Sequence, residues 1–232
     1  MVTANWVVNR HTAGNWEQIQ DTVIGEVPLN IHLDGSRVGT VFCIPSDLEL
    51  LVVGYLFQAR LIANDDDLEQ LIVDPEKNEA HAKRRLRTPS SPEPPRLEKP
   101  QVSPPLVVHL AETLAQNHLF RLTGAVHCGL IARQETVIFS TADTGRFNVL
   151  DKITGFLLKE RLSPTSLVLA FSGRLTHGVL QRVARAGIRA ILSPAAPTSG
   201  GLAIAAAEGI TTIGFARGER FNVYTDPERL LT

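Results

Sequence analysis

The chain has 232 residues, a hydrophobic fraction of 44% and a formal net charge of -1, from 23 basic and 24 acidic side chains. This length and apolar content allow one substantial core or two modest ones, and we expect two unequal lobes. The near-zero net charge argues against binding of nucleic acid or of a membrane through an overall field, so any anionic ligand must be held locally.

Cysteine and histidine usage argues against a protein-bound metal. The two cysteines, Cys43 and Cys128, lie far apart, and the seven histidines lack ligand spacing. We expect free thiols in a reducing compartment and no metal site made of side chains alone. Residues 1–15 do not read as a signal peptide, and no apolar run approaches a bilayer span, which together predict a cytoplasmic protein without membrane contact.

The N-terminal lobe, residues 1–73, is predicted to be a small α+β unit. Apolar residues alternate on both sides of Asp34-Gly35, which is a strong hairpin signal. Ser46, with Glu49 three residues later, has the pattern of a capping box. A helix is therefore expected to begin there and to run to about Arg60.

Composition changes over residues 74–105, where eight of the fourteen prolines lie. Because proline denies the chain regular hydrogen bonding, we expect a mobile loop or linker. A basic cluster in this segment could contact a nucleotide or an acidic partner, although a solvated charge run is the commoner explanation. The cluster comprises Lys83, Arg84, Arg85 and Arg87.

The second lobe, residues 106–232, is predicted to be α/β. After a helix over 106–115 and paired strands over 126–132 and 136–139, apolar periodicity predicts three strand–turn–helix units. After the strand at 136–139 and the helix that follows it, further strands are expected at 165–171, 188–192 and 210–215. The helices between these strands are expected to end at Gly187 and Gly209. An edge strand is expected at 221–225. Such units imply a largely parallel or mixed sheet with right-handed crossovers.

The polar turns that follow these strands should share one edge of the sheet. They span residues 143–148, 172–174, 193–199 and 215–220, and they supply helix N-termini, hydroxyls and several arginines. That combination suits a phosphate-bearing ligand, although neither a P-loop nor a GxGxxG motif is present. The stretch from Ala142 to Lys152 is the central candidate; a capped helix with a solvated first turn is the alternative.

Short motifs along nearly the whole chain resemble those of one family. In order they are Glu26-Val-Pro-Leu with Asp34-Gly35, Cys43-Ile-Pro-Ser-Asp-Leu, Thr123-Gly-Ala-Val-His127, Asp143-Thr-Gly-Arg-Phe-Asn, Ser172-Gly-Arg174, Ser193 with Ala196-Pro-Thr198, and Gly214-Phe-Ala-Arg217. Their order and spacing resemble the formate dehydrogenase accessory sulfurtransferases, the FdhD family. The resemblance implies a cytidine-deaminase-like three-layer α/β lobe with a smaller N-terminal α+β lobe, usually in a homodimer.

The resemblance also implies a function and a site. Members of the family take sulfur from a cysteine desulfurase and pass it to the guanine-dinucleotide form of the molybdenum cofactor, bis-molybdopterin guanine dinucleotide, before that cofactor enters formate dehydrogenase. The positions expected to bind this cofactor or a GDP-like nucleotide are Thr123, Gly124, His127, Asp143, Gly145, Arg146, Asn148, Asp151, Lys152, Ser172, Gly173, Arg174, Ser193, Pro197, Thr198, Phe215, Ala216, Arg217, Gly218, Glu219 and Arg220.

The sequence departs from the family at the sulfur carrier. The family holds a persulfide on a Cys-x-x-Cys pair in the loop between the lobes, whereas residues 87–96 here contain no cysteine. Serine cannot replace a thiolate in persulfide chemistry. In addition, Ala142 and Phe147 stand where the family usually carries Glu and His, and Ala59-Arg60 stands in place of a Glu-Gly pair.

Cys128 is the remaining candidate for a catalytic thiol, and a weak one. It follows His127 directly, but neighbours on a strand point to opposite faces, so His127 would not activate it. A buried cysteine more often acts as a small hydrophobe, and burial keeps its thiol inert. Cys43 is expected in the core for the same reason.

Three functions follow from these observations, and the sequence leaves open whether the protein is an enzyme. The first is sulfur transfer to the molybdenum cofactor for formate dehydrogenase. The second is a non-catalytic chaperone that binds the cofactor or a guanine nucleotide and has lost the sulfur-carrying cysteines. A deaminase-like hydrolase ranks last, because the chain lacks the cysteine and histidine ligands of a zinc deaminase.

Overall fold

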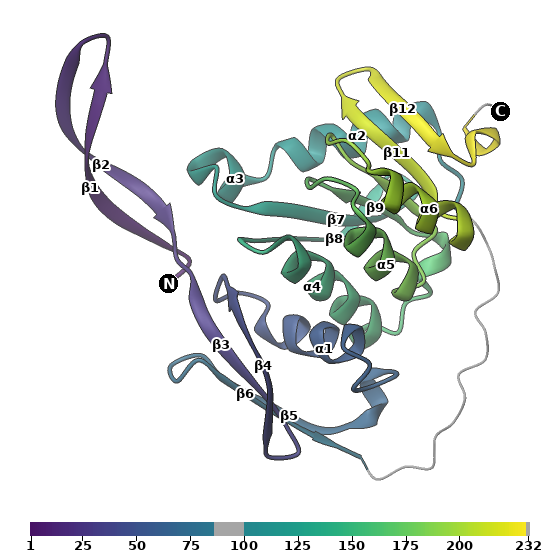
Figure 1. Cartoon of the computed structure of the whole chain (residues 1–232), viewed down its shortest axis with the longest axis horizontal. Coiled ribbons are helices and arrows are strands. Elements are labelled where there is room, and N and C mark those ends of the chain that lie inside the picture. Colours follow the sequence, from purple (N-terminus) through teal and green to yellow (C-terminus); the bar gives the residue numbers. More distant parts are fainter. Residues whose placement is uncertain (86–99, 231–232) are drawn as a thin grey trace.

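The structure, a computed structural model, describes residues 1–85 and 100–230, which form three β-sheets and six α-helices (Figure 1). A two-stranded arm, a four-stranded sheet with one helix, and a six-stranded sheet between helices follow one another along the chain. This is a mixed α/β architecture, as predicted. Short 3-10 helices occur at Asp65–Asp67, Pro164–Ser166 and Pro227–Arg229.

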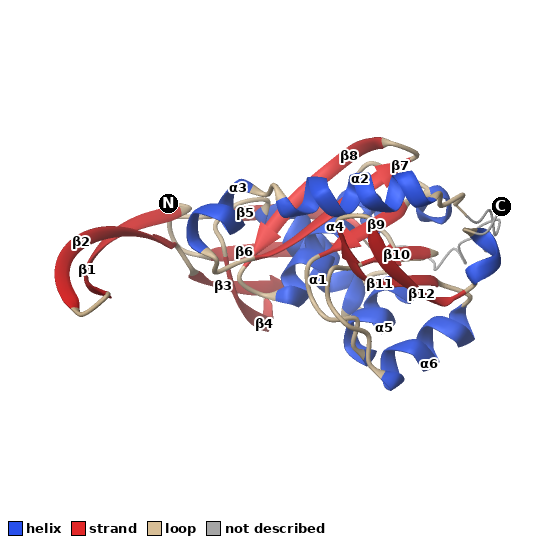
Figure 2. Cartoon of the chain, turned by 90° about the horizontal axis from the view of Figure 1, so that it is seen from above, coloured by secondary structure: helices blue, strands red, loops and turns tan. Residues whose placement is uncertain are grey.

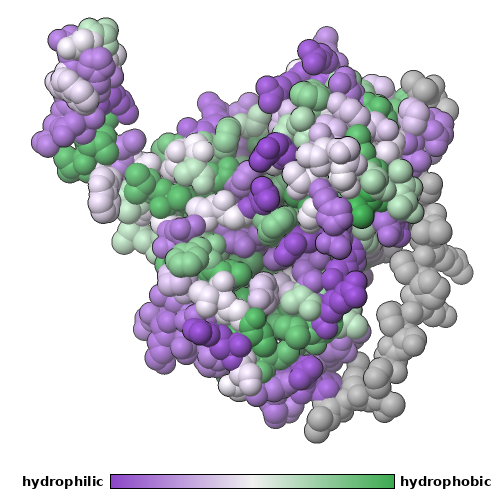
Figure 3. All heavy atoms as spheres, viewed as in Figure 1, coloured by the Kyte–Doolittle hydropathy of each residue, from purple (hydrophilic) through white to green (hydrophobic). Residues whose placement is uncertain are grey.

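The arm is an antiparallel hairpin of β1 (Thr3–Thr12) and β2 (Asn15–Ile24), and it projects from the rest of the molecule (Figure 1). Trp6 and Trp16 on it are 64% and 73% exposed, and its surface mixes hydrophilic and hydrophobic side chains (Figure 3). No helix or strand was predicted for these residues from the sequence. Because both faces of the ribbon meet solvent, its sequence lacks the alternation that marks a half-buried strand.

The second sheet has the strand order β4-β3-β6-β5, built from β3 (Val27–Leu33), β4 (Ser36–Cys43), β5 (Leu68–Asp74) and β6 (Glu79–Arg84). The predicted hairpin is confirmed: Asp34 and Gly35 have φ values of 50° and 80°, which suits a type I′ turn between β3 and β4. Leu29, Ile31 and Leu33 face the core on the side of α1 (Leu48–Gln58).

The loop predicted for residues 74–105 is wrong at both ends. β6 pairs with β3 and β5 and buries Ala80 and Ala82, while Pro104 begins α2 (Pro104–Ala115), where proline fits the first turn. In the basic cluster, Arg84 Nε lies 2.6 Å from Asp34 Oδ2 and Lys83 pairs with Glu69 on the sheet surface. The remainder of this prediction, over 86–99, lies outside the described residues.

Helix α1 was predicted in the right place but with the wrong cap. Asp47, with φ 51°, precedes the helix and makes no capping hydrogen bond; its Oδ2 accepts from Thr141 Oγ1 at 2.9 Å. Glu49 does not reach back along the chain, because its Oε2 lies 2.9 Å from Lys159 Nζ on α4 (Arg146–Lys159). The first turn of α1 is thus tied to the second lobe.

Glycines allow α1 and α4 to pack closely. A Cβ atom at Gly54 would overlap the backbone of Asp151, and one at Gly155 would overlap the backbone of Leu50. Since a backbone cannot move aside as a flexible side chain can, both positions require glycine. The two lobes therefore meet through a helix pair with little freedom to shift.

The third sheet has the order β12-β11-β10-β9-β7-β8 and forms the middle layer of the second lobe. Its strands are β7 (His127–Arg133), β8 (Thr136–Asp143), β9 (Val168–Phe171), β10 (Ala190–Leu192), β11 (Thr211–Arg217) and β12 (Arg220–Thr225). Figure 2 shows this sheet between α2 on one side and α5 (His177–Arg185) and α6 (Ser199–Glu208) on the other. Each face has its own apolar core.

The sequence predicted most of this lobe correctly. The helix from 106, the strand–turn–helix units and the edge strand β12 are confirmed, and Gly209 ends α6 with φ 61°. Helix α3 (His118–Thr123) was missed. Its six residues lie between the Asn117 and Gly124 caps and are too few to display helical periodicity.

Candidate functional site

The predicted meeting of the polar turns at one sheet edge is confirmed by the strand pairing. Strands β9, β10 and β11 run parallel, and β7 runs antiparallel to both β8 and β9. The carboxyl ends of β8, β9, β10 and β11 therefore share the edge at which β7 begins. His127 lies opposite Asp143 in the register at this edge.

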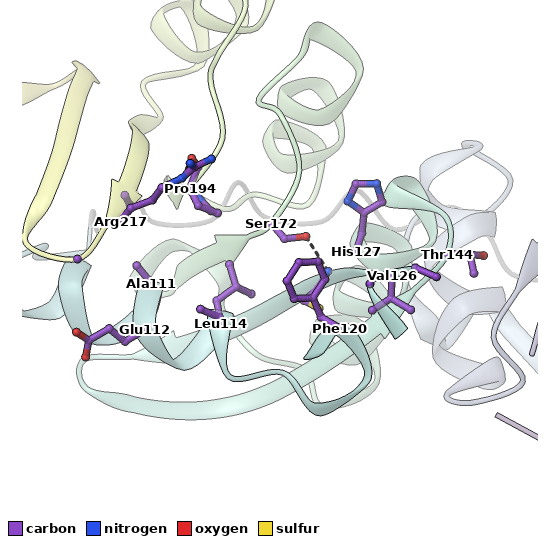
Figure 4. A pocket seen from close by; sticks show the side chains of 16 residues that line it. Ala111, Glu112, Leu114, Phe120, Val126, His127, Thr144, Ser172, Pro194 and Arg217 are labelled. Atoms are coloured by element: carbon purple, nitrogen blue, oxygen red, sulfur yellow. Dashed lines mark hydrogen bonds between the residues drawn. The ribbon is translucent and has the colours of Figure 1, made fainter. Parts of the chain in front are cut away.

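A pocket of about 690 Å³ opens here on the α2 side of the sheet. Figure 4 shows side chains from α2, α3 and the strand ends arranged around it. It is lined by Ala111, Glu112, Leu114, Ala115, Phe120, Gly124, Ala125, Val126, His127, Cys128, Thr144, Ser172, Pro194, Ala216, Arg217 and Gly218. This size and its largely apolar wall with few polar groups are typical of small-molecule sites, and we call it the edge pocket.

Arg217 brings a positive charge to the edge pocket. Its Nε donates to Pro194 O at 3.0 Å, which fixes the guanidinium against the turn after β10. The side chain is exposed, and no carboxylate among residues 1–85 and 100–230 forms an ion pair with it. Its terminal N–H groups are therefore available to an anion, which a guanidinium can bind in a bidentate manner.

A bulge in β11 places Arg217 on this wall. The pairing of β11 with β12 shifts register between Gly214 and Arg217, and Phe215 has φ 54°. A bulky residue in the left-handed region is strained, and such outliers concentrate at functional sites. Ala216 N donates to Ser193 O at 3.0 Å, which holds the bulged segment against the neighbouring turn.

Two serines brace the turns beside the pocket. Ser172 Oγ accepts from Cys128 N at 2.8 Å and joins the end of β9 to the start of β7 (Figure 4). Ser193 is fully buried; its Oγ donates to Gly173 O and accepts from Ala195 N, each at 2.9 Å. These bonds hold the wall in one geometry before any ligand arrives, which reduces the entropic cost of binding.

His127 is held as a neutral ring. Burial, and then the nearby charge of Arg146, lower its pKa below the usual value for histidine. The ring stacks with Phe171 at a centroid distance of 6.2 Å. A Cβ at Gly173 would lie 2.7 Å from the Phe171 ring, so only glycine leaves room for this arrangement. At neutral pH the imidazole offers one hydrogen-bond donor and one acceptor rather than a cation.

Asp143, the centre of the predicted ligand-binding turn, is instead fully buried and paired. Its Oδ2 lies 2.7 Å from Lys152 Nζ, and both side chains are 0% exposed. Asn148 Nδ2 donates to Asp143 Oδ1 at 2.9 Å and to Phe42 O at 2.7 Å, while Ile44 N donates to Asp143 Oδ2 at 3.3 Å. This buried network joins the turn to β4 and the segment after it.

Asp151 faces away from the pocket as well. Its Oδ1 lies 3.3 Å from Arg182 Nε of α5. Burial raises the pKa of its carboxyl group to about 7, Arg182 opposes that rise, and the charge of Asp143 adds to it. Its position between α4 and α5 gives it a role in helix packing.

The structure thus divides the predicted site. Seven of the predicted residues line the edge pocket: Gly124, His127, Cys128, Ser172, Ala216, Arg217 and Gly218. Those outside its lining are Thr123, Asp143, Gly145, Arg146, Asn148, Asp151, Lys152, Gly173, Arg174, Ser193, Pro197, Thr198, Phe215, Glu219 and Arg220. Arg146 and Arg174 are exposed near the same edge. Sequence reasoning missed the wall from α2 and Phe120, because an apolar helix face carries no mark that distinguishes a pocket from a core.

Neither thiol is suited to nucleophilic chemistry in this conformation. Cys128 is 2% exposed and packs in the core beneath α2, and burial raises its pKa to about 12. Cys43 is 0% exposed, and burial together with the charge of Asp143 raises its pKa to about 12. Both thiols therefore stay protonated at neutral pH, as expected for structural cysteines.

Within residues 1–85 and 100–230, no group of three or more histidine, cysteine or acidic side chains is placed to hold a metal ion. No helix in those ranges is long and apolar enough to cross a membrane.

Comparisons with known proteins agree on one relationship. The sulfur carrier protein FdhD of Staphylococcus aureus strain Newman is 29% identical over 249 residues, which cover 96% of this chain and 94% of that protein. The protein of the same name from strain MRSA252 is 28% identical over the same coverage. A crystal structure of a putative formate dehydrogenase accessory protein from Desulfotalea psychrophila superposes with a TM-score of 0.88 at 25% identity and covers 100% of both chains.

The family relationship extends through both lobes. The model of the FdhD/NarQ family matches residues 24–94 and 88–231, so it spans the four-stranded sheet, the helix pair between the lobes and the edge pocket. On this evidence of sequence and fold together, the chain belongs to the FdhD/NarQ family.

Proposed function

We propose that this protein serves formate dehydrogenase as an accessory protein, and that its edge pocket binds the guanine-nucleotide end of the molybdenum cofactor. The observation that carries the proposal is the pocket itself. Arg217, which forms no ion pair with the described residues, stands beside a preformed, largely apolar cavity at the edge where the strands end. The names of the relatives, a sulfur carrier and a formate dehydrogenase accessory protein, support the same role.

The residues of the edge pocket fit a nucleotide. Its volume of about 690 Å³ lies within the range that holds small ligands. The apolar side chains of α2 and Phe120 offer a surface for a base, and the Arg217 guanidinium suits a phosphate. When bound, the cofactor would supply the molybdenum centre that receives sulfur; the residues of the pocket would orient its nucleotide.

A second candidate function is sulfur carriage by this chain itself. It rests on Cys128, which is the cysteine on the wall of the edge pocket. Its 2% exposure and raised pKa oppose thiolate formation, and residues 87–96 provide no other thiol. We therefore favour cofactor binding without sulfur carriage. Delivery by a cysteine desulfurase, homodimer assembly and a cytoplasmic location remain predictions.

The binding proposal is tested with GDP as the probe. A ligand that binds only the folded state raises the melting temperature as its concentration increases. We expect GDP to raise the melting temperature progressively up to millimolar concentration, and AMP to have a smaller effect. An unchanged melting temperature at millimolar GDP would contradict the proposal.

Sulfur carriage has a separate test. The protein is incubated with a cysteine desulfurase and cysteine, and its intact mass is measured without reductant. We expect no added sulfur on the wild-type protein. A mass increase of one sulfur atom that disappears in Cys128→Ser would show a persulfide on Cys128 and would restore the second candidate, whatever the outcome with GDP.

A further inference from the structure

A second hollow, of about 380 Å³, lies where the C-terminal ends of α1 and α5 meet. It shares no lining residue with the edge pocket. Its wall is formed by Phe57, by residues 60–63, by Asp67 and by Arg185. We call it the arginine hollow, because Arg60 and Arg185 both line it.

The positive charges of the arginine hollow are not balanced by carboxylates of the described chain. Neither Arg60 nor Arg185 forms an ion pair with an acidic side chain among residues 1–85 and 100–230. Burial, and then the charges of Arg60 and Arg182, lower the pKa of Arg185. Arg182 has its own partner in Asp151. The hollow itself is therefore lined by two guanidinium groups, those of Arg60 and Arg185.

Asp67 is the acidic residue on this wall, and its carboxylate is already engaged. Its Oδ2 accepts from Ala63 N at 2.7 Å and from Asn64 N at 3.2 Å. These bonds cap the short 3-10 turn that begins at Asp65. Asp67 Oδ2 thus binds backbone donors of its own segment, and among the described residues the carboxylate forms no ion pair with Arg60 or Arg185.

The backbone of Arg60 is strained, and the local fold does not account for an arginine there. Arg60 has φ 63° and follows the last turn of α1, in the position where helices prefer glycine. The hydrogen bonds that end the helix, Arg60 N to Phe57 O and Leu61 N to Leu56 O, use backbone atoms only. Glycine would form them without strain, so these backbone bonds do not require an arginine side chain.

Arg161 provides an internal comparison. It follows α4 with φ 52°, and Leu162 N donates to Leu157 O in the same closing pattern. Its guanidinium, however, lies 2.8 Å from Asp66 Oδ1 and does not line the arginine hollow. Two arginines thus occupy equivalent strained positions, and the one in the hollow forms no ion pair with a carboxylate of residues 1–85 or 100–230.

We propose that the arginine hollow binds a phosphate-type oxyanion between the guanidinium groups of Arg60 and Arg185. Arg185 Nη1 donates to Gln58 O at 2.8 Å, which orients this side chain along the wall. Its other N–H groups and those of Arg60 supply the forked donors that fit phosphate oxygens. The proposal does not depend on the function of the edge pocket.

The opposing explanation is that both arginines only balance the C-terminal dipoles of α1 and α5. Arg60→Gly separates the two explanations. Removal of the strain should leave the melting temperature without phosphate unchanged or higher, whereas loss of a dipole partner should lower it. Arg161→Gly is the matched control, because it relieves the same conformation outside the hollow.

The melting temperature of the full chain is measured as a function of the concentration of inorganic phosphate, and chloride is added to keep the ionic strength constant. We expect phosphate to stabilise wild type and Arg161→Gly equally, and Arg60→Gly to need at least tenfold more phosphate for the same shift. Arg60→Lys should retain part of the response. A wild type that does not respond, or an Arg60→Gly variant that responds as wild type does, overturns the proposal.

Discussion

At one edge of the six-stranded sheet, a network of polar side chains is buried, whereas a nearby arginine is exposed to solvent. The buried network of Asp143, Asn148 and Lys152 is satisfied internally, and it joins the second lobe to Phe42 O and Ile44 N of the first. Arg217, on the wall of the edge pocket, is exposed and lacks a carboxylate partner in the described chain. Polar residues that follow a strand can therefore serve assembly or binding, and burial distinguishes the two uses.

The largest effect expected from this comparison is on stability. Lys152→Met should lower the free energy of unfolding by about 3–5 kcal/mol, because it leaves the Asp143 carboxylate buried without its partner. Urea denaturation at neutral pH measures the change. The double variant Asp143→Asn with Lys152→Met should recover a substantial part of the loss. A loss below about 1 kcal/mol would mean that the pair behaves as a hydrated surface ion pair.

A smaller effect is expected from pH through Asp151. Its pKa of about 7 in the folded state lies above the unfolded value of about 3.9. The stability that it contributes is complete below pH ~3.9 and is lost as pH rises through about 7. Asp151→Asn should remove this decline. Denaturation of both proteins between pH 5 and 8 tests it, and parallel stability profiles would contradict the assignment.

The comparison also explains which parts of the site could be predicted. Sequence periodicity placed the strands and helices, so the shared edge followed from topology. Periodicity could not reveal that the end of β4 and the residue after it would cover this turn, because the contacts join residues about 100 positions apart. Ile44 N donates to Asp143, and Phe42 O accepts from Asn148. For the same reason a polar turn was interpreted as a ligand site when half of it is interior.

The elements that were missed have related causes. The arm of β1 and β2 is exposed to solvent on both faces, and β6 buries only two alanine side chains. Neither segment therefore shows a strong alternation of large apolar residues with polar ones. Proline density downstream led to the prediction of a loop that extended too far toward the N-terminus. Local patterns therefore located the elements that bury large side chains, whereas tertiary pairing decided the others.

The smallest expected energetic effect concerns the exposed side of the comparison. Arg217→Ala should weaken GDP binding about 10-fold to 100-fold, which corresponds to about 1.4–2.7 kcal/mol, because one charge-assisted contact to phosphate is lost. Its stability without ligand should stay within about 0.5 kcal/mol of wild type, since the side chain is exposed. Calorimetric titration with GDP measures the affinity. Arg121→Ala is the matched control, because Arg121 is also exposed and does not line the edge pocket. If both variants bind GDP as wild type does, the guanidinium of Arg217 is a solvated surface charge, and the contrast with Lys152 lies in burial alone.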